Sequence, residues 1–596
     1  MTNKTILVIT ISAILMAGTI PINNVFAITE TKLTASDAAA VDVFGTSVSI
    51  SGDTAIVGAD SDDDNGFNSG SAYIFTRTGG VWSEQAKLIA SDGARNDRFG
   101  NSVSISGDTV IVGAFLDDDA CPSDELCNSG SAYIFTRTGG VWSEQAKLIA
   151  SDAAAGDGFG RSVSISGDTV IVGALSDDNG FNSGSAYIFT RTGGVWSEQI
   201  KLIASDSTIG DVFGWSVSIS GDTAIVGVPG DNDLSGSPST GSAFIFTRSG
   251  EGVWSEQAKL TDVLGEAGDK FGESVSISGD TAIVGVPGDD SETVPGDTGV
   301  DFGSAHIFTG SGGVWIEQAK LTASDAARQD NFGNSVSISG DTAIVGVPSN
   351  DDDGNSSGSA YIFTGSGGVW IEQKLTASDA AETDLFGISV SISGDTAIVG
   401  TPLDDDDGNG SGSAYIYELT TNTPPTALDD NAETLSNVSV EIDVLANDSD
   451  VDEDSLEIIS TSDPSNGVAE ISSDNLSITY TPNLGYTGDN SFDYTISDGN
   501  DGSATATVMV TVLTPEEGIG NLKDQVDELG LPQGPLTNIL QLLNDNNPRN
   551  DQAACGMLTE FITNVEGFIA NGDVTPQEGQ ALIDAAEDIK TSLGIC

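Results

Sequence analysis

The sequence is poor in the residues on which most enzymes and most nucleic-acid-binding surfaces depend. It holds one histidine, His306, which leaves little support for a Ser-His-Asp triad or a histidine-bound zinc site. Lysine and arginine number 20 against 90 acidic residues, so the net charge of −70 excludes nucleic acid as a partner. No phosphate-binding loop and no dinucleotide fingerprint occurs in the sequence. The composition therefore favours a binding protein over an enzyme.

Cysteine and long apolar runs are scarce as well. The four cysteines fall into two pairs, Cys121 with Cys127 and Cys555 with Cys596, as expected for disulfides in an oxidising compartment. Residues 1–27 are predicted to be a signal peptide, with a lysine near the start, an apolar core and a small-residue cleavage site. A membrane anchor is the alternative, but the run is short for a span. We expect a secreted or extracellular chain, released or kept at the cell surface, with no membrane span once mature.

What the sequence has in abundance is repetition. The stretch Phe44–Leu88 recurs with small changes until residue 417. Its opening Phe-Gly pair returns every 54 to 61 residues, which gives seven copies. The pairs begin at Phe44, Phe99, Phe159, Phe213, Phe271, Phe332 and Phe386. A period of this size, made of short strands, predicts a β-propeller.

One copy contains four predicted strands. Ser47–Ser51 alternates apolar and small polar residues, and a Gly-Asp turn leads into the β-branched run Thr54–Ala59. After an acidic loop, Ser71–Arg77 and Val81–Leu88 form a second hairpin around Gly-Gly. The last copy lacks its fourth strand, while Thr29–Asp37 matches the ending of that strand. The N-terminal segment is therefore predicted to close blade seven, with the propeller spanning residues 28–420.

The predicted strand order separates two faces of the propeller. The turns within hairpins are short and uniform, whereas the loops between second and third strands are long, varied and acidic, and they share a face with the blade-to-blade connections. These loops are Asp60–Ser69, Leu116–Ser129, Asp231–Thr240, Asp289–Phe302, Asp351–Ser357 and Asp404–Ser411. We expect this acidic face to bind the ligand, because variable loops on a rigid scaffold usually carry function.

The residue after each Phe-Gly pair varies while its neighbours repeat. Arg161, Trp215 and Glu273 occupy this position in three successive copies, and we select them as ligand-face candidates. A tryptophan there can stack on a sugar ring or a partner side chain, although it can equally fill a local gap. His306 stands where other copies have Tyr or Phe, so we interpret it as a packed substitute for an aromatic ring.

The repeated motif resembles the FG-GAP repeat of integrin α-chain propellers and their prokaryotic relatives. The resemblance rests on F-G, V-G-V-P (as at Val226–Pro229) and G-S-A-Y-I-F, and it covers about two thirds of the chain. It implies ligand binding on the face that carries the acidic loops. Those propellers bind calcium in a D-x-D-x-D-G loop between the first two strands, where every copy here has only Gly-Asp. Their metal sites are therefore not carried over, and calcium at the longer acidic loops stays open.

Residues 421–425 are a proline-containing linker, and residues 426–514 read as a β-sandwich of immunoglobulin size. The segment resembles the cadherin-like modules of large prokaryotic surface proteins, through I-D-V-L-A-N-D-S-D-V-D-E-D-S-L and G-Y-T-G-D-N-S-F-D-Y-T-I-S-D-G. Four carboxylates alternate along one loop, and two more lie at the domain entrance, where such modules add ligands. We predict calcium at Asp429, Asp430, Asp448, Asp450, Asp452 and Asp454, with a merely polar turn as the alternative.

Residues 515–596 change to helical periodicity and form a predicted tail. Two antiparallel helices joined by Asn571–Val574 would bring Cys555 close to Cys596, so a disulfide between them is expected. The fold class is thus mainly β: a seven-bladed propeller, an Ig/cadherin-like sandwich and a small helical domain. We interpret the protein as a non-enzymatic adhesion or recognition protein for an extracellular protein or glycan, with calcium as cofactor. The alternative is a carbohydrate-active propeller, either a lectin or a glycan hydrolase or lyase.

Overall fold

The computed structural model describes residues 26–118, 127–177, 182–232, 239–290, 301–366, 369–421, 423–452, 454–499, 502–543, 548–594 and 596. The predicted signal peptide and Cys121 therefore lie, wholly or almost wholly, outside the described residues. The chain divides into two compact units, residues 27–420 and residues 421–596. Within the described residues, none of the helices is both long and apolar enough to cross a membrane.

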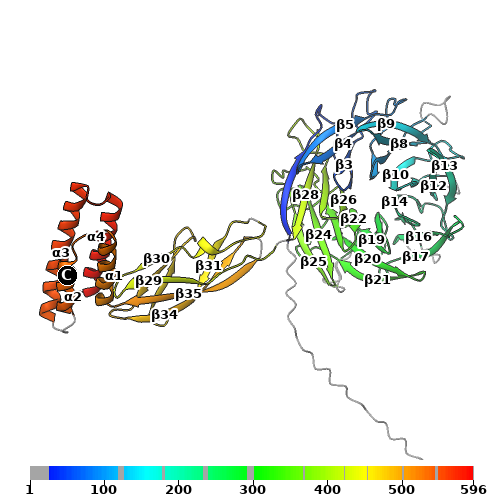
Figure 1. The fold of residues 1–596 in the computed structure, drawn as a ribbon. Coiled ribbons are helices and arrows are strands. Elements are labelled where there is room, and N and C mark those ends of the chain that lie inside the picture. Colours follow the sequence, from blue (N-terminus) through cyan, green and yellow to red (C-terminus); the bar gives the residue numbers. More distant parts are fainter. Residues whose placement is uncertain are drawn as a thin grey trace, which may run out of the picture. The chain divides into compact units, whose positions relative to one another are not determined.

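The first unit is a ring of seven four-stranded antiparallel sheets, which confirms the predicted propeller (Figure 1). Blades one to three are β2 (Ser47–Ser51), β3 (Thr54–Ala59), β4 (Ser71–Thr78), β5 (Val81–Leu88); β6 (Ser102–Ser106), β7 (Thr109–Ala114), β8 (Ser131–Thr138), β9 (Val141–Leu148); β10 (Phe159–Ser166), β11 (Thr169–Ala174), β12 (Ser185–Thr192), β13 (Val195–Leu202). Blades four to seven are β14 (Ser216–Ser220), β15 (Thr223–Val228), β16 (Ser242–Arg248), β17 (Trp254–Leu260); β18 (Ser274–Ser278), β19 (Thr281–Val286), β20 (Ser304–Ser311), β21 (Val314–Leu321); β22 (Ser335–Ser339), β23 (Thr342–Val347), β24 (Ser359–Ser366), β25 (Val369–Leu375); and β26 (Ser389–Ser393), β27 (Thr396–Thr401), β28 (Ser413–Thr421), β1 (Phe26–Leu33).

Apolar residues and serines alternate along the first strand of each blade, and the two kinds of residue make different contacts. Its apolar residues are buried within the blade, while its serines accept hydrogen bonds from the first strand of the next blade. Ser47 Oγ accepts from Val103 N at 3.0 Å, and Ser49 Oγ accepts from Ile105 N at 3.2 Å. The inner strands are thus joined by side chain to backbone bonds, which satisfies backbone groups that would otherwise lie unpaired between sheets.

The apolar core lies between successive blades. Phe99 of blade two packs edge-on against Tyr133, with ring centroids 5.5 Å apart, and shares a core with Ile56 and Ile74 of blade one. The blades approach so closely that a Cβ on Gly58 would lie 1.9 Å from the carbonyl oxygen of Gly100. The glycine in each V-G pair is therefore required by the backbone of the neighbouring blade.

The N-terminal strand closes the ring as predicted, because β1 pairs with β28 as the outer strand of blade seven. The carboxylate of Glu30 accepts hydrogen bonds from Ser378 Oγ at 2.6 Å and from Tyr417 OH at 3.0 Å. An ion pair of 2.8 Å between Arg77 of blade one and Glu418 of blade seven spans the same junction. Strand pairing, hydrogen bonds and charge therefore join the two ends of the repeat region.

The second unit begins with a two-sheet sandwich that confirms the predicted Ig-like fold. One sheet has the order β29-β35-β34-β31 and the other β30-β33-β32. Their bounds are β29 (Asp430–Leu435), β30 (Val440–Ile442), β31 (Glu457–Thr461), β32 (Gly467–Ile471), β33 (Ile478–Pro482), β34 (Gly488–Ser497) and β35 (Ser503–Leu513), with the 3-10 helix η1 (Val444–Asn447). Tyr480 and Tyr494 are fully buried between the sheets.

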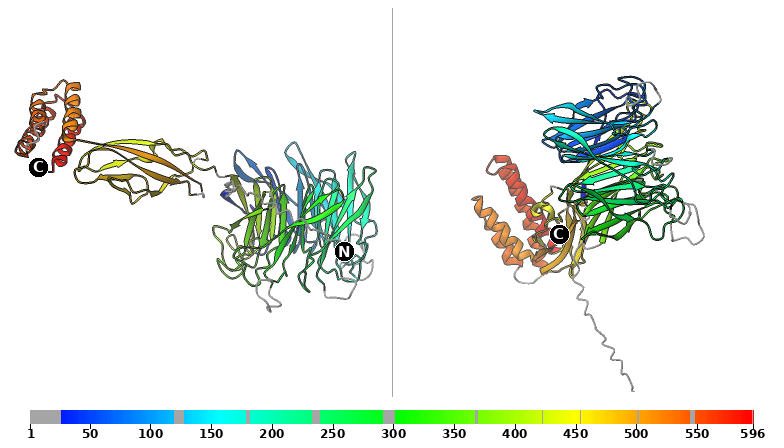
Figure 2. Two further views of the ribbon diagram at one scale, coloured as in Figure 1. Left: turned by 90° about the horizontal axis from the view of Figure 1, so that it is seen from below. Right: turned by 90° about the vertical axis from the view of Figure 1, so that its right-hand side faces the viewer.

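Four helices complete this unit and pack as one bundle (Figure 2). They are α1 (Pro515–Glu528), α2 (Gly534–Leu543), α3 (Pro548–Asn571) and α4 (Pro576–Leu593). The Cys555–Cys596 disulfide forms with Cα atoms 5.7 Å apart. Leu435 of the sandwich packs into the helical core, where a Cβ on Gly518 would lie 2.6 Å from it. Sandwich and bundle therefore share a packed interface.

Candidate functional site

Each acidic loop of the propeller meets a lysine of its own blade. In blade one, Lys87 Nζ lies 2.8 Å from Asp37 and 2.7 Å from Asp62, and Asp64 is 2.6 Å away. The hydroxyl oxygen of Tyr73 lies 2.8 Å from a carboxylate oxygen of Asp37 and 2.8 Å from one of Asp62, so its single hydrogen can be donated to either. We call this arrangement of one lysine, one tyrosine and two aspartates the blade quartet.

The quartet recurs around the ring with few changes. Its lysines are Lys87, Lys147, Lys201, Lys259, Lys320, Lys374 and Lys32, in blade order. Phe244 and His306 replace the tyrosine in blades four and five, and Asn350 replaces one aspartate in blade six. Burial lowers the pKa of Lys87, but its hydrogen bonds to Asp37, Asp62 and Asp64 outweigh this, so the pKa lies above its ordinary value. The carboxylates of the quartets are therefore paired with a cation that the chain itself supplies.

The three ligand-face candidates lie together at the start of three neighbouring inner strands. The Arg161 guanidinium lies over the ring of Trp215, 5.3 Å from its centroid, and Trp215 and Glu273 line one hollow together. Arg161 Nη1 also donates to Asn101 Oδ1 at 2.9 Å. Strand β10 begins at Phe159, earlier than in the other blades, so Arg161 is part of the strand itself. Sequence positions more than fifty residues apart thus form one continuous polar and aromatic group.

The two charged residues of this group, Arg161 and Glu273, are partly buried, and burial shifts the pKa of each. Burial lowers the pKa of Arg161, against the attraction of Glu273 and Asp60. Burial raises the pKa of Glu273, although the nearby Lys270, the Trp215 indole and the charge of Arg161 act to lower it. Beside the group lies a hollow of about 540 Å³ lined by Trp215 and Glu273, together with Pro229, Ala267 and other residues. Trp215, Glu273 and Lys270 give this hollow an aromatic wall, a carboxylate and a cation. These are the features of a site for a polar ligand.

In the sandwich, three of the six predicted calcium ligands come together. Asp450, Asp452 and Asp454 each offer a carboxylate oxygen within 4.8 Å of the others. Asp450 Oδ1 accepts from Asp452 N at 2.7 Å and from Asp454 N at 3.3 Å. The Oδ2 atoms of Asp450 and Asp454 are buried and have no hydrogen-bond partner among the described residues. Buried carboxylate oxygens without partners fit a hard cation such as calcium.

The other three predicted ligands make different contacts. Asp448 and Asp430 accept from the hydroxyl of Tyr494 at 3.1 Å and 3.0 Å. Asp429 accepts from Thr507 N at 2.9 Å. Burial raises the pKa of both Asp448 and Asp430, and the charge of Asp448 adds to the effect at Asp430. The structure therefore brings Asp450, Asp452 and Asp454 together. The other three predicted ligands accept hydrogen bonds from other residues of the sandwich.

Two further sequence predictions concern cysteine and histidine. Cys127 takes part in a disulfide, while Cys121 lies outside the described residues. His306 is buried and packs edge-on against Phe271 at 5.6 Å, as expected for a residue that replaces an aromatic ring. The lysines of the blade quartets were missed, although K-L followed by A-S-D recurs in the copies and could have indicated them.

Comparison with known families agrees with both β-domains. Seven segments match the family model described as FG-GAP repeat and together cover more than half of the chain. They are residues 28–75, 82–135, 142–189, 196–246, 254–308, 315–363 and 370–417. Residues 422–511 match the model described as Bacterial Ig domain. A search of the curated proteins found no match.

Proposed function

The chain belongs to the FG-GAP repeat family, and on that premise we propose that it is a secreted, non-enzymatic recognition protein. Its propeller binds an extracellular protein or glycan at the group formed by Arg161, Trp215 and Glu273. FG-GAP repeats and bacterial Ig domains are both typical of extracellular proteins, which supports a place outside the cell. The hollow beside Trp215 is the observation that carries the proposal.

A glycan is favoured over a protein as the ligand of this hollow. A sugar ring presents an apolar face to an aromatic side chain and hydroxyl groups to a carboxylate, and Trp215 and Glu273 offer both. Glu273 is the one carboxylate among the described lining residues of this hollow. Because glycoside hydrolysis commonly needs two carboxylates, this hollow supports glycan binding, as in a lectin, more than glycan hydrolysis.

Calcium supports the sandwich in this proposal. A cation at Asp450, Asp452 and Asp454 would occupy the two carboxylate oxygens that have no partner and remove repulsion within the loop. The ion would fix the loop next to the start of the domain, since Asp452 Oδ2 accepts from Thr423 N at 2.6 Å. The role is structural: it stiffens the segment that follows the propeller.

The test is a binding screen on a glycan array and a panel of purified extracellular proteins, run beside a hydrolysis assay on polysaccharides. Trp215→Thr places the residue of blade one, Thr46, in blade four and should weaken binding about tenfold by loss of aromatic contact. Ile388→Thr changes the equivalent position of blade seven and serves as the control. Unchanged binding by Trp215→Thr would contradict the site, and turnover of any polysaccharide would contradict the non-enzymatic proposal.

A further inference from the structure

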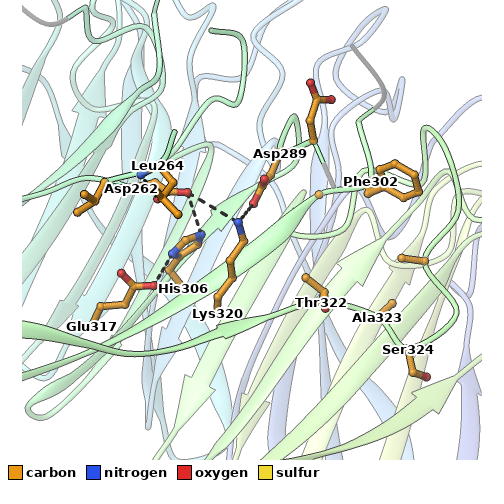
Figure 3. Close-up of a pocket in the computed structure, with 14 residues that line it drawn as sticks. Asp262, Leu264, Asp289, Phe302, His306, Glu317, Lys320, Thr322, Ala323 and Ser324 are labelled. Atoms are coloured by element: carbon orange, nitrogen blue, oxygen red, sulfur yellow. Dashed lines mark hydrogen bonds and ion pairs between the residues drawn. The ribbon is translucent and has the colours of Figure 1, made fainter. Parts of the chain in front are cut away.

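Blade five contains an opened version of the blade quartet. Here His306, on β20, takes the place of the tyrosine, and its side chain is 1% exposed. Figure 3 shows the imidazole pointing toward Asp262, with Lys320 and Asp289 next to it and Glu317 on its other side. The cluster borders a cavity of about 850 Å³.

The opening is visible in one distance. In the other six blades, the quartet lysine lies 2.7 to 2.9 Å from the aspartate that precedes the blade. In blade five, Lys320 Nζ lies 3.9 Å from Asp262 while it keeps a 2.7 Å contact with Asp289. Asp262 Oδ1 accepts from Leu264 N at 2.8 Å. Its Oδ2 has only the longer ion-pair distances, 3.7 Å to His306 and 3.9 Å to Lys320, among the described residues.

The neighbours of His306 determine which ring nitrogen is available. Nδ1 lies 2.9 Å from Glu317 Oε1 and donates its hydrogen to that carboxylate. The hydroxyl of Ser304 donates to Asp289, so its hydrogen is not available to Nε2, which lies 3.2 Å away. In the neutral imidazole, Nε2 then presents a lone pair toward the carboxylates. A carboxylate that orients a histidine through its second nitrogen is typical of histidine ligands in metal sites.

We propose that Asp262, Asp289 and His306 form a binding site for a divalent transition-metal ion such as zinc. One ligand atom from each residue lies within 4.8 Å of the other two. One imidazole and two carboxylates suit zinc, nickel, cobalt or copper better than calcium, which prefers oxygen ligands alone. The adjoining cavity leaves room for water or another ligand to complete the coordination.

Lys320 competes with the metal for Asp289. Its side chain is one third exposed, so the ammonium can turn toward solvent when a cation enters. The quartet of blade seven provides a comparison, because Asp379, Asp404 and Asp406 are equally close together. There Lys32 lies within 2.8 Å of all three carboxylates and no imidazole is present. Blade five is thus distinguished by an imidazole and by a lysine that has withdrawn from one carboxylate.

The experiment is zinc titration of the full chain by calorimetry, with calcium in excess to fill sites made of oxygen alone. Because His306 is the chain's only histidine, ¹³C-labelled histidine gives a single imidazole NMR signal that must shift as zinc binds. His306→Tyr restores the residue of five other blades and should abolish the site. Lys320→Met should tighten binding by at least about tenfold, because a competing positive charge is removed. Glu317→Gln should weaken it by about 10–100-fold.

Melting temperatures of the variants in zinc-free buffer show whether each one folds. Zinc binding that survives His306→Tyr, or an imidazole signal that stays unmoved at saturating zinc, would overturn the proposal. Weaker zinc binding by a folded Lys320→Met would overturn the assignment of Lys320 as the competitor, and with it this geometry of the site.

Discussion

The acidic loops of the propeller and the acidic loop of the sandwich both bring carboxylates close together, but they differ in what compensates the negative charge. In blade one, Lys87 lies within 2.8 Å of three carboxylates, so the repeat brings its own cation on a side chain. In the sandwich, Asp450 and Asp454 each keep a buried oxygen without a partner among the described residues. Asp-rich loops of one chain can therefore differ in whether they need an ion from solution. Counting aspartates does not reveal this difference.

The largest expected effect comes from breaking blade seven, where strand β1 supplies both the closing edge and the quartet lysine, Lys32. Deletion of Ile28–Leu33 removes Lys32 and the buried Leu33, whose burial alone is worth about 2–5 kcal/mol of stability. The exposed edge of β28 should also promote association. Calorimetry and light scattering measure the two effects. A truncated protein that melts with the intact one and stays monomeric would contradict the closure.

The next prediction removes the lysine from one blade quartet, which leaves a cluster of carboxylates without a cation, as in the sandwich. Lys87→Met leaves Asp62, which is 3% exposed, without its cation and should cost about 1–3 kcal/mol in calcium-free buffer. Millimolar calcium should recover part of this loss, because three neighbouring carboxylates then lack a cation. The control is Lys590→Met, which breaks a surface pair with Glu587 on α4 and should cost at most about 0.5 kcal/mol. A variant whose melting does not respond to calcium would show that the blade geometry cannot hold an ion.

Calcium should stabilise the unit that contains the sandwich and leave the propeller unit less affected. In the full chain, a hundredfold excess over Kd should stabilise the unit that contains the sandwich by about 2.7 kcal/mol, because the ion binds only the folded loop. Asp450→Asn combined with Asp454→Asn should abolish this shift, and Asp429→Asn serves as the control. If calcium stabilises the propeller alone, the assignment of the calcium site to the sandwich is wrong.

The last expected effect is a pH dependence from two buried propeller carboxylates outside the quartets, Asp97 and Asp269. Burial raises the pKa of Asp97 and of Asp269 to about 7 and neighbouring carboxylates add to the shift, against a backbone hydrogen bond at each and the charge of Lys147 at Asp97. Between pH 7 and the unfolded value near 4, the folded state binds more protons, so stability rises as the pH falls through this window. Each group contributes at most about 1.4 kcal/mol per pH unit.

Thermal melts of the propeller at pH 5.5 and pH 8 measure this dependence. Asp97→Asn keeps an acceptor for Ala94 N and should flatten the profile, whereas the exposed Asp53→Asn should leave it unchanged. A propeller that melts higher at pH 8 than at pH 5.5 would contradict the assigned direction.

Repetition made most of the propeller predictable from the sequence. Seven copies of one pattern define each strand several times over, and the match between the N-terminal segment and a fourth-strand ending predicted the closure. Smaller features required the structure. The fourth strands of six repeats end in K-L, and in five of them an extra residue is absorbed as a bulge, such as Gln85 between Glu84 and Ala86. Blade six lacks that extra residue and pairs without a register shift.

The candidate sites were predictable only where one position departs from the repeat. Trp215, Arg161 and Glu273 stood out in this way, and their contact depends on a ring geometry that brings successive blades together. The quartets were missed because each combines residues from a preceding connection, a loop and a fourth strand, all of which repeat. The hydroxyl of Tyr494 engages Asp448 and Asp430 inside the sandwich, a contact that ligand spacing does not reveal.

The position of β1 also constrains the order in which the protein can assemble. Glu30 and its partner Tyr417 are 387 positions apart in the chain. During synthesis from the N-terminus, strand β1 is made first and stays unpaired until β28, its partner in blade seven, has been made. The ring then closes in one late step, and a chain arrested before β28 leaves two open edges for proteases or chaperones to recognise. Closure of the ring thus requires the complete repeat region.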